Sequence, residues 1–366
     1  MKRIAADSTL PEAADPSFSA DIIAWQRQHG RHALPWQNTN DAYRIWLSEI
    51  MLQQTQVATV IPYYQRFLQR FPTLADLAQA PVGDVMAHWA GLGYYTRARN
   101  LQRCAQVVVA QHGGQFPADP AQLAELPGIG RSTAAAIAAF GFGARAAIMD
   151  GNVKRVFARV FGVTEFPGLK PVEERLWRHA QALLPRDEGI QSYTQGLMDL
   201  GATICTRSKP ACARCPLQAR CVALAQDQVA ALPMRKPKKA VPQKFCSMLV
   251  AVHQGQVLLL QRPALGIWAG LLSLPELNGQ QSEAASFAQE QVERVLLPFG
   301  SVASVSALEP ISHGFTHFKL AIQPYLVHMS QRQVLAGQIE YQWLDLADVA
   351  RAALPAPVKK LLLGLV

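Results

Sequence analysis

Long apolar runs are what this sequence most clearly lacks. No apolar run within its 366 residues reaches the length that a membrane-spanning helix needs. Residues 1–17 contain Lys2 and Arg3 but no apolar segment behind them, so they do not resemble a secretory signal. We therefore expect a short flexible leader there and a protein that works in the cytoplasm, associated with the nucleoid if it binds DNA.

Charged residues are also scarce, and positively charged residues outnumber negatively charged ones. Only 17% of the residues are charged while 50% are hydrophobic, which excludes a disordered chain and indicates folded domains with apolar cores. Lys and Arg number 35 against 26 Asp and Glu, a formal net charge of +9. This excess favours a polyanionic partner, but charge alone does not separate DNA from RNA or from a membrane surface.

Cysteine is infrequent and unevenly placed. Four of the six cysteines lie within 17 residues, in the pattern Cys205-x6-Cys212-x2-Cys215-x5-Cys221. In a chain with no export signal, such a cluster indicates a metal site more than disulfides. Four thiolates can hold zinc or a cubane iron–sulfur cluster, and the spacing leaves both open, with a disulfide pair as the remaining alternative.

The pattern of apolar and polar residues changes near residue 227. Before it, apolar residues recur at helical spacing, as in Tyr43, Trp46, Leu47, Ile50 and Met51. We therefore predict an all-helical region over residues 18–226.

The C-terminal third has a different pattern. Residues 227–244 are rich in Pro, Lys and Arg and are typical of a semi-stiff basic linker. Beyond them, residues 245–261 and 315–327 are predicted strands, and residues 357–365 a closing helix. Residues 245–366 should therefore form an α+β domain, and the whole chain should be multidomain.

A glycine-containing turn separates two predicted helices, residues 119–125 and 131–140. Its sequence is Leu-Pro-Gly128-Ile-Gly130. Two glycines permit a tight turn and let another molecule approach the backbone closely. The amides that open the second helix would face a phosphate, as in a helix-hairpin-helix that holds DNA without reading its sequence. The alternative is a plain turn between two helices.

Several motifs together resemble one family. They are, in order, LSEIMLQQTQ at 47–56, GLGYY at 91–95, the glycine hairpin, DGNVKRV at 150–156 and the cysteine cluster. The chain resembles adenine DNA glycosylases of the MutY type, within the endonuclease III superfamily. The resemblance implies an all-α helix-hairpin-helix glycosylase core, with a six-helix module over about 40–150 and an iron–sulfur module from 18–39 plus 151–226. It also implies a Nudix-like domain over residues 245–366.

The function that the resemblance implies is base excision repair. A monomeric enzyme would hydrolyse the N-glycosidic bond of adenine mispaired with 8-oxoguanine, or with guanine, in duplex DNA. The four clustered cysteines, Cys205, Cys212, Cys215 and Cys221, would hold a 4Fe-4S cluster.

Cleavage of this bond needs a proton for the departing base and negative charge beside the sugar cation. By resemblance Glu49 is the acid that protonates adenine at N7, Asp150 stabilises the cation, and Asn152 helps to orient the site. From the residues alone, Glu49 shares a polar helix face with Gln53 and Gln56 and could be a solvated surface residue. Asp150 precedes a predicted helix and could simply be its N-cap.

Ser132 distinguishes two reaction types. In the related bifunctional enzymes this position is a lysine that attacks the sugar and leads to strand cleavage. A hydroxyl cannot form a Schiff base, so the resemblance implies a monofunctional enzyme that leaves an abasic site.

Other positions match residues that contact DNA in the family. Gln54 and Tyr94 match residues that wedge into the duplex, and Trp36 and Gln195 match positions that line the adenine pocket. Without the family, Tyr94 could be a core residue and Gln54 a surface amide. Four basic residues are expected to contact phosphate: Arg97, Arg99, Lys154 and Arg155. From the residues alone, each could instead be a solvated cation.

The start of the C-terminal domain resembles a Nudix hydrolase. Gly270 and Glu276 match the first two conserved positions of the Nudix box, the sequence motif that binds divalent metal in such enzymes. The box then needs R-E-x-x-E-E, whereas residues 284–289 are AASFAQ, so we predict no nucleotide hydrolysis. The family's lesion-recognition loop is F-S-H, which corresponds here to Phe315, Thr316 and His317. Without the family, these residues could be an ordinary loop between two strands.

Three other functions fit the sequence less well. An endonuclease III-like pyrimidine glycosylase with lyase activity is disfavoured by Ser132 and by the extra domain. A non-catalytic DNA-damage-binding protein is disfavoured because both Glu49 and Asp150 are present, and a nucleotide-pool hydrolase is disfavoured by the defective box.

Overall fold

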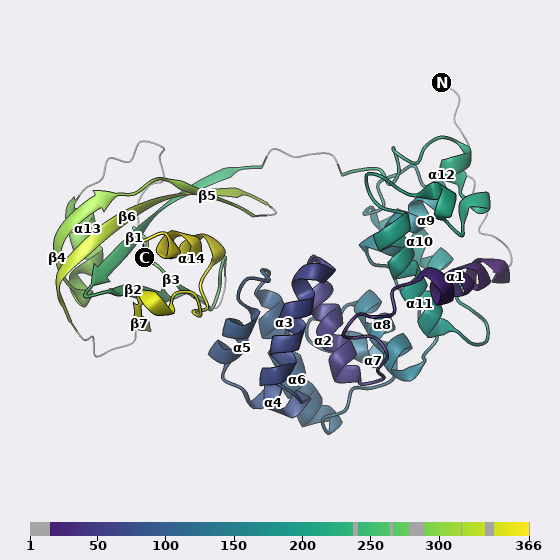
Figure 1. The fold of residues 1–366 in the computed structure, drawn as a ribbon, viewed down its shortest axis with the longest axis horizontal. Helices are drawn as coiled ribbons and strands as arrows, with labels where there is room; N and C mark the ends of the chain where they lie inside the picture. The colour runs from purple at the N-terminus through teal and green to yellow at the C-terminus, as the bar shows by residue number, and fades with distance from the viewer. Residues whose placement is uncertain are drawn as a thin grey trace. The chain divides into compact units, whose positions relative to one another are not determined.

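The computed structural model describes residues 15–236, 241–263, 266–277, 289–315, 317–333 and 340–365. Most of the predicted leader, residue Thr316 of the predicted recognition loop and residues 284–288 of the Nudix box lie outside this range. The chain divides into two compact units, one made of Met1–Gln79 with Asn100–Pro237 and the other of Ala80–Arg99 with Lys238–Val366 (Figure 1).

The first unit is helical. Its α-helices are α1 (Pro16–His29), α2 (Ala42–Leu52), α3 (Val57–Arg70), α4 (Leu74–Gln79), most of α6 (Thr96–His112), α7 (Pro120–Glu125), α8 (Arg131–Phe142), α9 (Gly151–Val160), α10 (Lys170–Ala182), α11 (Ile190–Asp199) and α12 (Val222–Ala225). A short π-helical segment, Leu200–Ile204, continues directly from α11. Within the described residues no helix is long and apolar enough to cross a membrane.

Helix α2 confirms the helical spacing of the apolar residues in the sequence. Asp41 caps its start by accepting hydrogen bonds from the amides of Tyr43 and Arg44. The apolar stripe is buried, with Trp46 and Met51 fully so, because it packs against α3 and α8. This packing leaves the polar face of α2, with Glu49, for the site.

Helices α7 and α8 form the predicted hairpin. Gly128 has φ +79°, in the left-handed region, and a Cβ there would lie 2.8 Å from Cβ of Asn100. Gly130 is the N-cap of α8, has φ −91°, and a Cβ there would meet nothing within 4 Å. The fold therefore requires glycine at 128, whereas the space at 130 is open.

Helices α1 and α11 are far apart in sequence and pack against each other. Ile22 of α1 and Leu197 of α11 belong to the same buried apolar core. A Cβ on Gly196 would lie 2.7 Å from a methyl carbon of Ile22, so glycine allows this close approach. The contact joins the N-terminal helix to the segment that carries Gln195.

The second unit is built on a mixed sheet, in which the structure describes seven strands. They are β1 (Gln243–His253), β2 (Gln256–Gln261), β3 (Leu272–Ser273), β4 (Gly300–Ala307), β5 (Ile311–Gly314), β6 (Lys319–Arg332) and β7 (Tyr341–Asp345). The order is β3-β2-β1-β6-β4, with β5 also paired to β6 and β7 to β2. Only the β1–β6 pair is parallel among these pairings.

Helices complete the second unit. They are α5 (Val82–Trp89), α13 (Gln289–Leu296) and α14 (Ala356–Leu363). Helix α13 packs beside β4, and α14 lies beside β5. The predicted strands and the closing helix are therefore present. The many Val and Leu residues of the predicted strand region 245–261 are explained by the buried positions of β1 and β2.

Candidate active site

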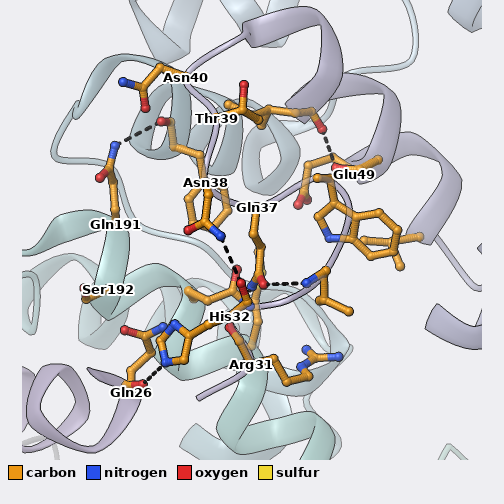
Figure 2. Close-up of a pocket in the computed structure, with 18 of the residues that line it drawn as sticks. Gln26, Arg31, His32, Gln37, Asn38, Thr39, Asn40, Glu49, Gln191 and Ser192 are labelled. Atoms are coloured by element: carbon orange, nitrogen blue, oxygen red, sulfur yellow. Dashed lines mark hydrogen bonds between the residues drawn. The ribbon is translucent and has the colours of Figure 1, made fainter. Parts of the chain in front are cut away.

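A cavity of about 360 Å³ opens in the first unit. Its lining comes from the segment after α1, from α2 and from α11, and includes Arg31, Trp36, Glu49 and Gln195. Figure 2 shows Glu49 and Gln191 among the side chains around it. The volume lies in the range of small-molecule pockets, so one nucleobase is a suitable occupant in size.

Glu49 projects from α2 into this cavity and is partly buried. Loss of solvent raises the pKa of its carboxyl group to about 8, and the negative charge of Asp150 acts in the same direction. A carboxyl group with this pKa is mostly protonated at neutral pH. Glu49 can therefore donate a proton, which an ordinary surface glutamate cannot do.

Asp150 is the N-cap of α9, as its position before a helix predicted. Its Oδ1 accepts a hydrogen bond of 2.7 Å from the amide of Val153, and its Oδ2 accepts one of 3.2 Å from Nδ2 of Asn152. Burial raises the pKa of Asp150 above its ordinary value, and these hydrogen bonds offset that rise only in part. The capping role and a role in chemistry are compatible, because the cap fixes the carboxylate in place.

The structure brings the two carboxyl groups into electrostatic contact. They lie far apart in sequence, yet the charge of Asp150 helps to raise the pKa of Glu49. Within the described residues, hydrogen bonds that favour ionisation reach Asp150 but not Glu49. The pair can therefore hold one protonated and one ionised carboxyl group.

Ser132 lies in the first turn of α8. Its hydroxyl oxygen accepts a hydrogen bond of 2.9 Å from the amide of Met149, the residue before Asp150. The side chain therefore supports the segment that presents Asp150. It carries no amine with which to attack a sugar.

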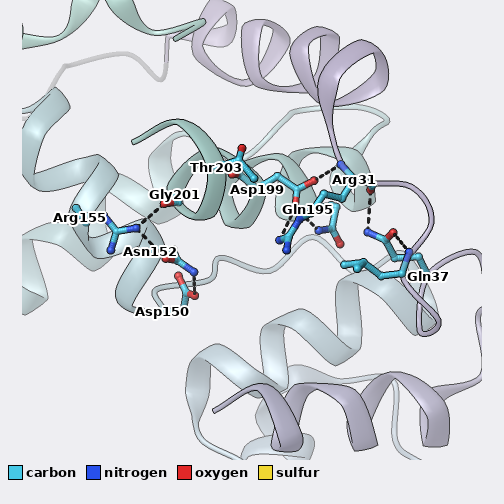
Figure 3. A network of polar contacts seen from close by, with 10 residues as sticks. Arg31, Gln37, Asp150, Asn152, Arg155, Gln195, Asp199, Gly201 and Thr203 are labelled. Carbon is cyan, nitrogen blue, oxygen red and sulfur yellow. Dashed lines mark hydrogen bonds and ion pairs between the residues drawn. The ribbon is translucent and has the colours of Figure 1, made fainter. Parts of the chain in front are cut away.

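A polar network contacts residues of the cavity lining, and Figure 3 shows Arg31, Gln195 and Asp199 within it. Asp199, at the end of α11, accepts hydrogen bonds from the amide and the guanidinium of Arg31 at 2.8 and 2.7 Å. It also accepts one of 2.8 Å from Nε2 of Gln195. Sequence reasoning found Gln195 but missed Asp199, whose signal was a carboxylate within the apolar run Leu-Met-Asp-Leu.

The predicted wedge residues have unusual backbones. Gln54 and Tyr94 have φ values of +57° and +49°, which non-glycine residues seldom adopt. Tyr94 is 49% exposed, so it is not a core residue. Such strain often marks functional positions.

The hairpin presents an open helix start. No side chain caps α8, whose N-cap is Gly130. Its first amides are therefore free of a side-chain cap and suit an anionic ligand.

The four clustered cysteines border one small cavity with an apolar lining. Burial is the main cause that raises the pKa of Cys215 to about 11, and the charges of the other three thiols contribute to this rise. All six cysteines are unpaired, and no three His, Cys, Asp or Glu side chains among the described residues converge as a single-ion site. Four thiols around a shared space fit a cluster that spans them, and the positive charge of its core would relieve the mutual repulsion of the thiolates.

Two arginines hold the cysteine loop. Arg159 is buried and donates to Sγ of Cys205 at 3.3 Å and to the carbonyl of Leu232 at 2.9 Å. Arg155 donates to the carbonyl of Cys205 and to Oδ1 of Asn152. The expectation that Arg155 contacts phosphate gains no support, because internal acceptors occupy its guanidinium.

The predicted lesion loop lies at the β5–β6 turn of the second unit. The amide of Phe315 donates to the carbonyl of Phe318 at 2.8 Å, and the two rings stack with centroids 4.5 Å apart. His317 is exposed. Thr316, the middle residue of this predicted loop, lies outside the described residues.

In the Nudix-like domain, the carboxylate at the second conserved position of the Nudix box, Glu276, is already paired. Glu276 forms an ion pair of 2.5 Å with Arg262. Gly270 has φ +73°, so glycine suits its turn. The absence of nucleotide hydrolysis stays a prediction.

Comparison with known proteins identifies the class that this fold and site define. Residues 47–182 match the HhH-GPD superfamily of base excision DNA repair proteins, and residues 247–364 match the NUDIX domain. A solved thermostable thymine-DNA glycosylase has a TM-score of 0.52 and 30% identity, and the match covers 57% of this chain and 96% of that one. The chain is a DNA glycosylase, an enzyme that hydrolyses N-glycosidic bonds, with an added Nudix-like domain.

Relatives that match nearly all of this chain identify the family. An adenine DNA glycosylase of Buchnera aphidicola subsp. Baizongia pistaciae is 34% identical, with 94% of this chain and 95% of the relative covered. The adenine DNA glycosylase of Homo sapiens is also 34% identical, with 94% and 73% covered. The chain belongs to the adenine DNA glycosylase family of base excision repair.

Proposed function

We propose that this enzyme removes adenine mispaired with 8-oxoguanine, and less readily with guanine, from duplex DNA. The observation that carries the proposal is Glu49, whose carboxyl group borders a cavity of nucleobase size and has a pKa raised to about 8. The proton that it holds at neutral pH is the one that a departing purine needs.

The reaction begins when adenine leaves the base stack and enters the cavity. Trp36 and Gln195 line the space that it occupies. Glu49 protonates N7 of adenine, which weakens the bond to the sugar. The carboxylate of Asp150, fixed by Val153 and Asn152, stabilises the positive charge that develops on the sugar.

Water then completes the hydrolysis and leaves an abasic site. Ser132 supplies no amine for a Schiff base, so strand cleavage does not follow from this site. The enzyme is monofunctional in this proposal.

The DNA is held by the uncapped start of α8, with Gly130 leaving room for the backbone. Gln54 and Tyr94 enter the duplex near the lesion. Phe315, Thr316 and His317 recognise the 8-oxoguanine on the opposite strand.

The four cysteines hold a 4Fe-4S cluster in this proposal. Their shared cavity and the buried Arg159 beside Cys205 support it. When bound, the cluster supplies structural order to the loop between Cys205 and Cys221.

A single-turnover experiment tests the proposal. Duplexes carrying adenine opposite 8-oxoguanine, guanine, cytosine or thymine are incubated with excess enzyme, and products are examined before and after alkali. We expect rapid adenine release opposite 8-oxoguanine, slower release opposite guanine, and strand breaks only after alkali. Strand breaks without alkali at the rate of base release would contradict the monofunctional assignment.

A further inference from the structure

The carboxylate of Asp199 does not border the cavity, yet it contacts two side chains that do. Its side chain is 1% exposed, and it accepts hydrogen bonds from Arg31 and from Gln195. Both donors line the cavity. Asp199 is therefore placed to fix how these two side chains face a bound base.

The chemistry of a carboxylate determines the orientation of Gln195. An ionised carboxylate only accepts hydrogen bonds, so the amide nitrogen of Gln195 must face Asp199. Its carbonyl oxygen then faces away from Asp199, and among the described residues none donates a hydrogen bond to it. Gln195 is held as a hydrogen-bond acceptor.

Arg31 supplies the opposite polarity. Asp199 engages one edge of its guanidinium, and a guanidinium has only donors. The loop that carries it is braced by Gln37, which donates to the carbonyl of Arg31 at 2.9 Å. The cavity thus presents one fixed acceptor and one fixed donor.

We propose that Asp199 is a positioning residue that sets base specificity by locking Gln195 as an acceptor beside the donor Arg31. Adenine offers an amino donor at its 6-position and an acceptor at N1, which complement this pair. Hypoxanthine offers an acceptor at the 6-position and a donor at N1. Its acceptor would therefore face the carbonyl oxygen of Gln195 and its donor would face Arg31, so neither hydrogen bond forms. The inference rests on the proposed adenine excision.

The test compares adenine, hypoxanthine and purine, each opposite 8-oxoguanine, in single-turnover release. In Asp199→Asn, an amide nitrogen replaces one of the two acceptor oxygens and opposes a donor that the carboxylate accepted from, which loosens the lock. We expect the adenine-to-hypoxanthine rate ratio to fall at least about ten-fold relative to the parent enzyme. Asp199→Glu keeps an acceptor-only group and should retain more of the ratio than Asp199→Asn.

Thr203→Ala is the matched control. Its hydroxyl donates to the backbone carbonyl of Asp199 at 2.8 Å and not to the carboxylate, so the ratio should not change. In a Gln195→Leu background, Asp199→Asn should produce a smaller further change in the ratio, because only the contact of Asp199 with Arg31 then remains to be altered.

A second measurement does not depend on the folding of the Asp199 variants. Gln195→Leu should raise the hypoxanthine-to-purine ratio, because the opposed carbonyl is removed. An unchanged ratio there, or equal losses for every base in Asp199→Asn, would overturn the lock. Failure of the parent enzyme to release adenine would instead overturn the proposed function and the lock with it.

Discussion

At the scale of single residues, Glu49 carries the most direct prediction. Glu49→Gln keeps the shape of the side chain but has no proton to donate, so base release should fall by at least about a hundred-fold while lesion-duplex binding is largely kept. Single-turnover rates and dissociation constants at one salt concentration measure both. Release near the parent rate would remove Glu49 from the acid role.

The pH dependence follows from the same carboxyl group. Since the pKa of Glu49 is raised to about 8, the rate should fall as pH rises through that value. A rate that stays level well above that pH would contradict the assignment.

Glu49 should also make stability depend on pH. Its pKa is about 8 when folded and near 4.5 when unfolded, so the folded state binds the proton more tightly, and the free energy of unfolding falls as pH rises between these values. The fall is at most about 1.4 kcal/mol per pH unit. Glu49→Gln should therefore raise Tm more near the upper of these two pH values than near the lower, and an equal gain at both would argue against the raised pKa.

At the scale of elements, the hairpin separates two roles for glycine. Gly128→Ala places a Cβ 2.8 Å from Asn100 at a positive φ, so it should lower the free energy of unfolding by about 1–3 kcal/mol. Gly130→Ala meets no neighbour and should change stability little. It should weaken DNA binding, since the Cβ enters the space beside the start of α8. Denaturation and binding curves distinguish the two.

The cysteine loop gives a second prediction at this scale. The purified protein should be brown and contain about four irons without stoichiometric zinc. Cys212→Ser should reduce iron content and DNA affinity. Elemental analysis showing one zinc per chain would overturn the cluster assignment.

At the scale of the whole molecule, we expect the glycosylase domain to release adenine and the Nudix-like domain to supply the preference for 8-oxoguanine. A chain ending after Lys236 keeps Glu49, Asp150 and the carbonyl of Leu232 that Arg159 contacts. It should release adenine opposite guanine measurably but lose part of its preference for 8-oxoguanine. In the full chain, Phe315→Ala with His317→Ala should reproduce part of that loss, about 1–3 kcal/mol. A truncated enzyme with the full preference would show that this loop is not the lesion reader.

The sequence by itself determined the elements and the chemistry of several positions. The stripe of α2, the two helices of the hairpin and the strands of the C-terminal domain follow from local periodicity and glycine placement, which act within a few residues. Membership of the family followed from short motifs in a fixed order, and the comparisons confirmed it.

Only the tertiary structure decided what these residues meet. Asp150 reaches Glu49, and Asp199 reaches Arg31, through packing between segments that are distant in sequence. Arg155 holds the cysteine loop, which no local pattern indicated. The physical reason is that pKa values, side-chain orientation and buried hydrogen bonds depend on neighbours in space, and a local pattern does not specify those neighbours.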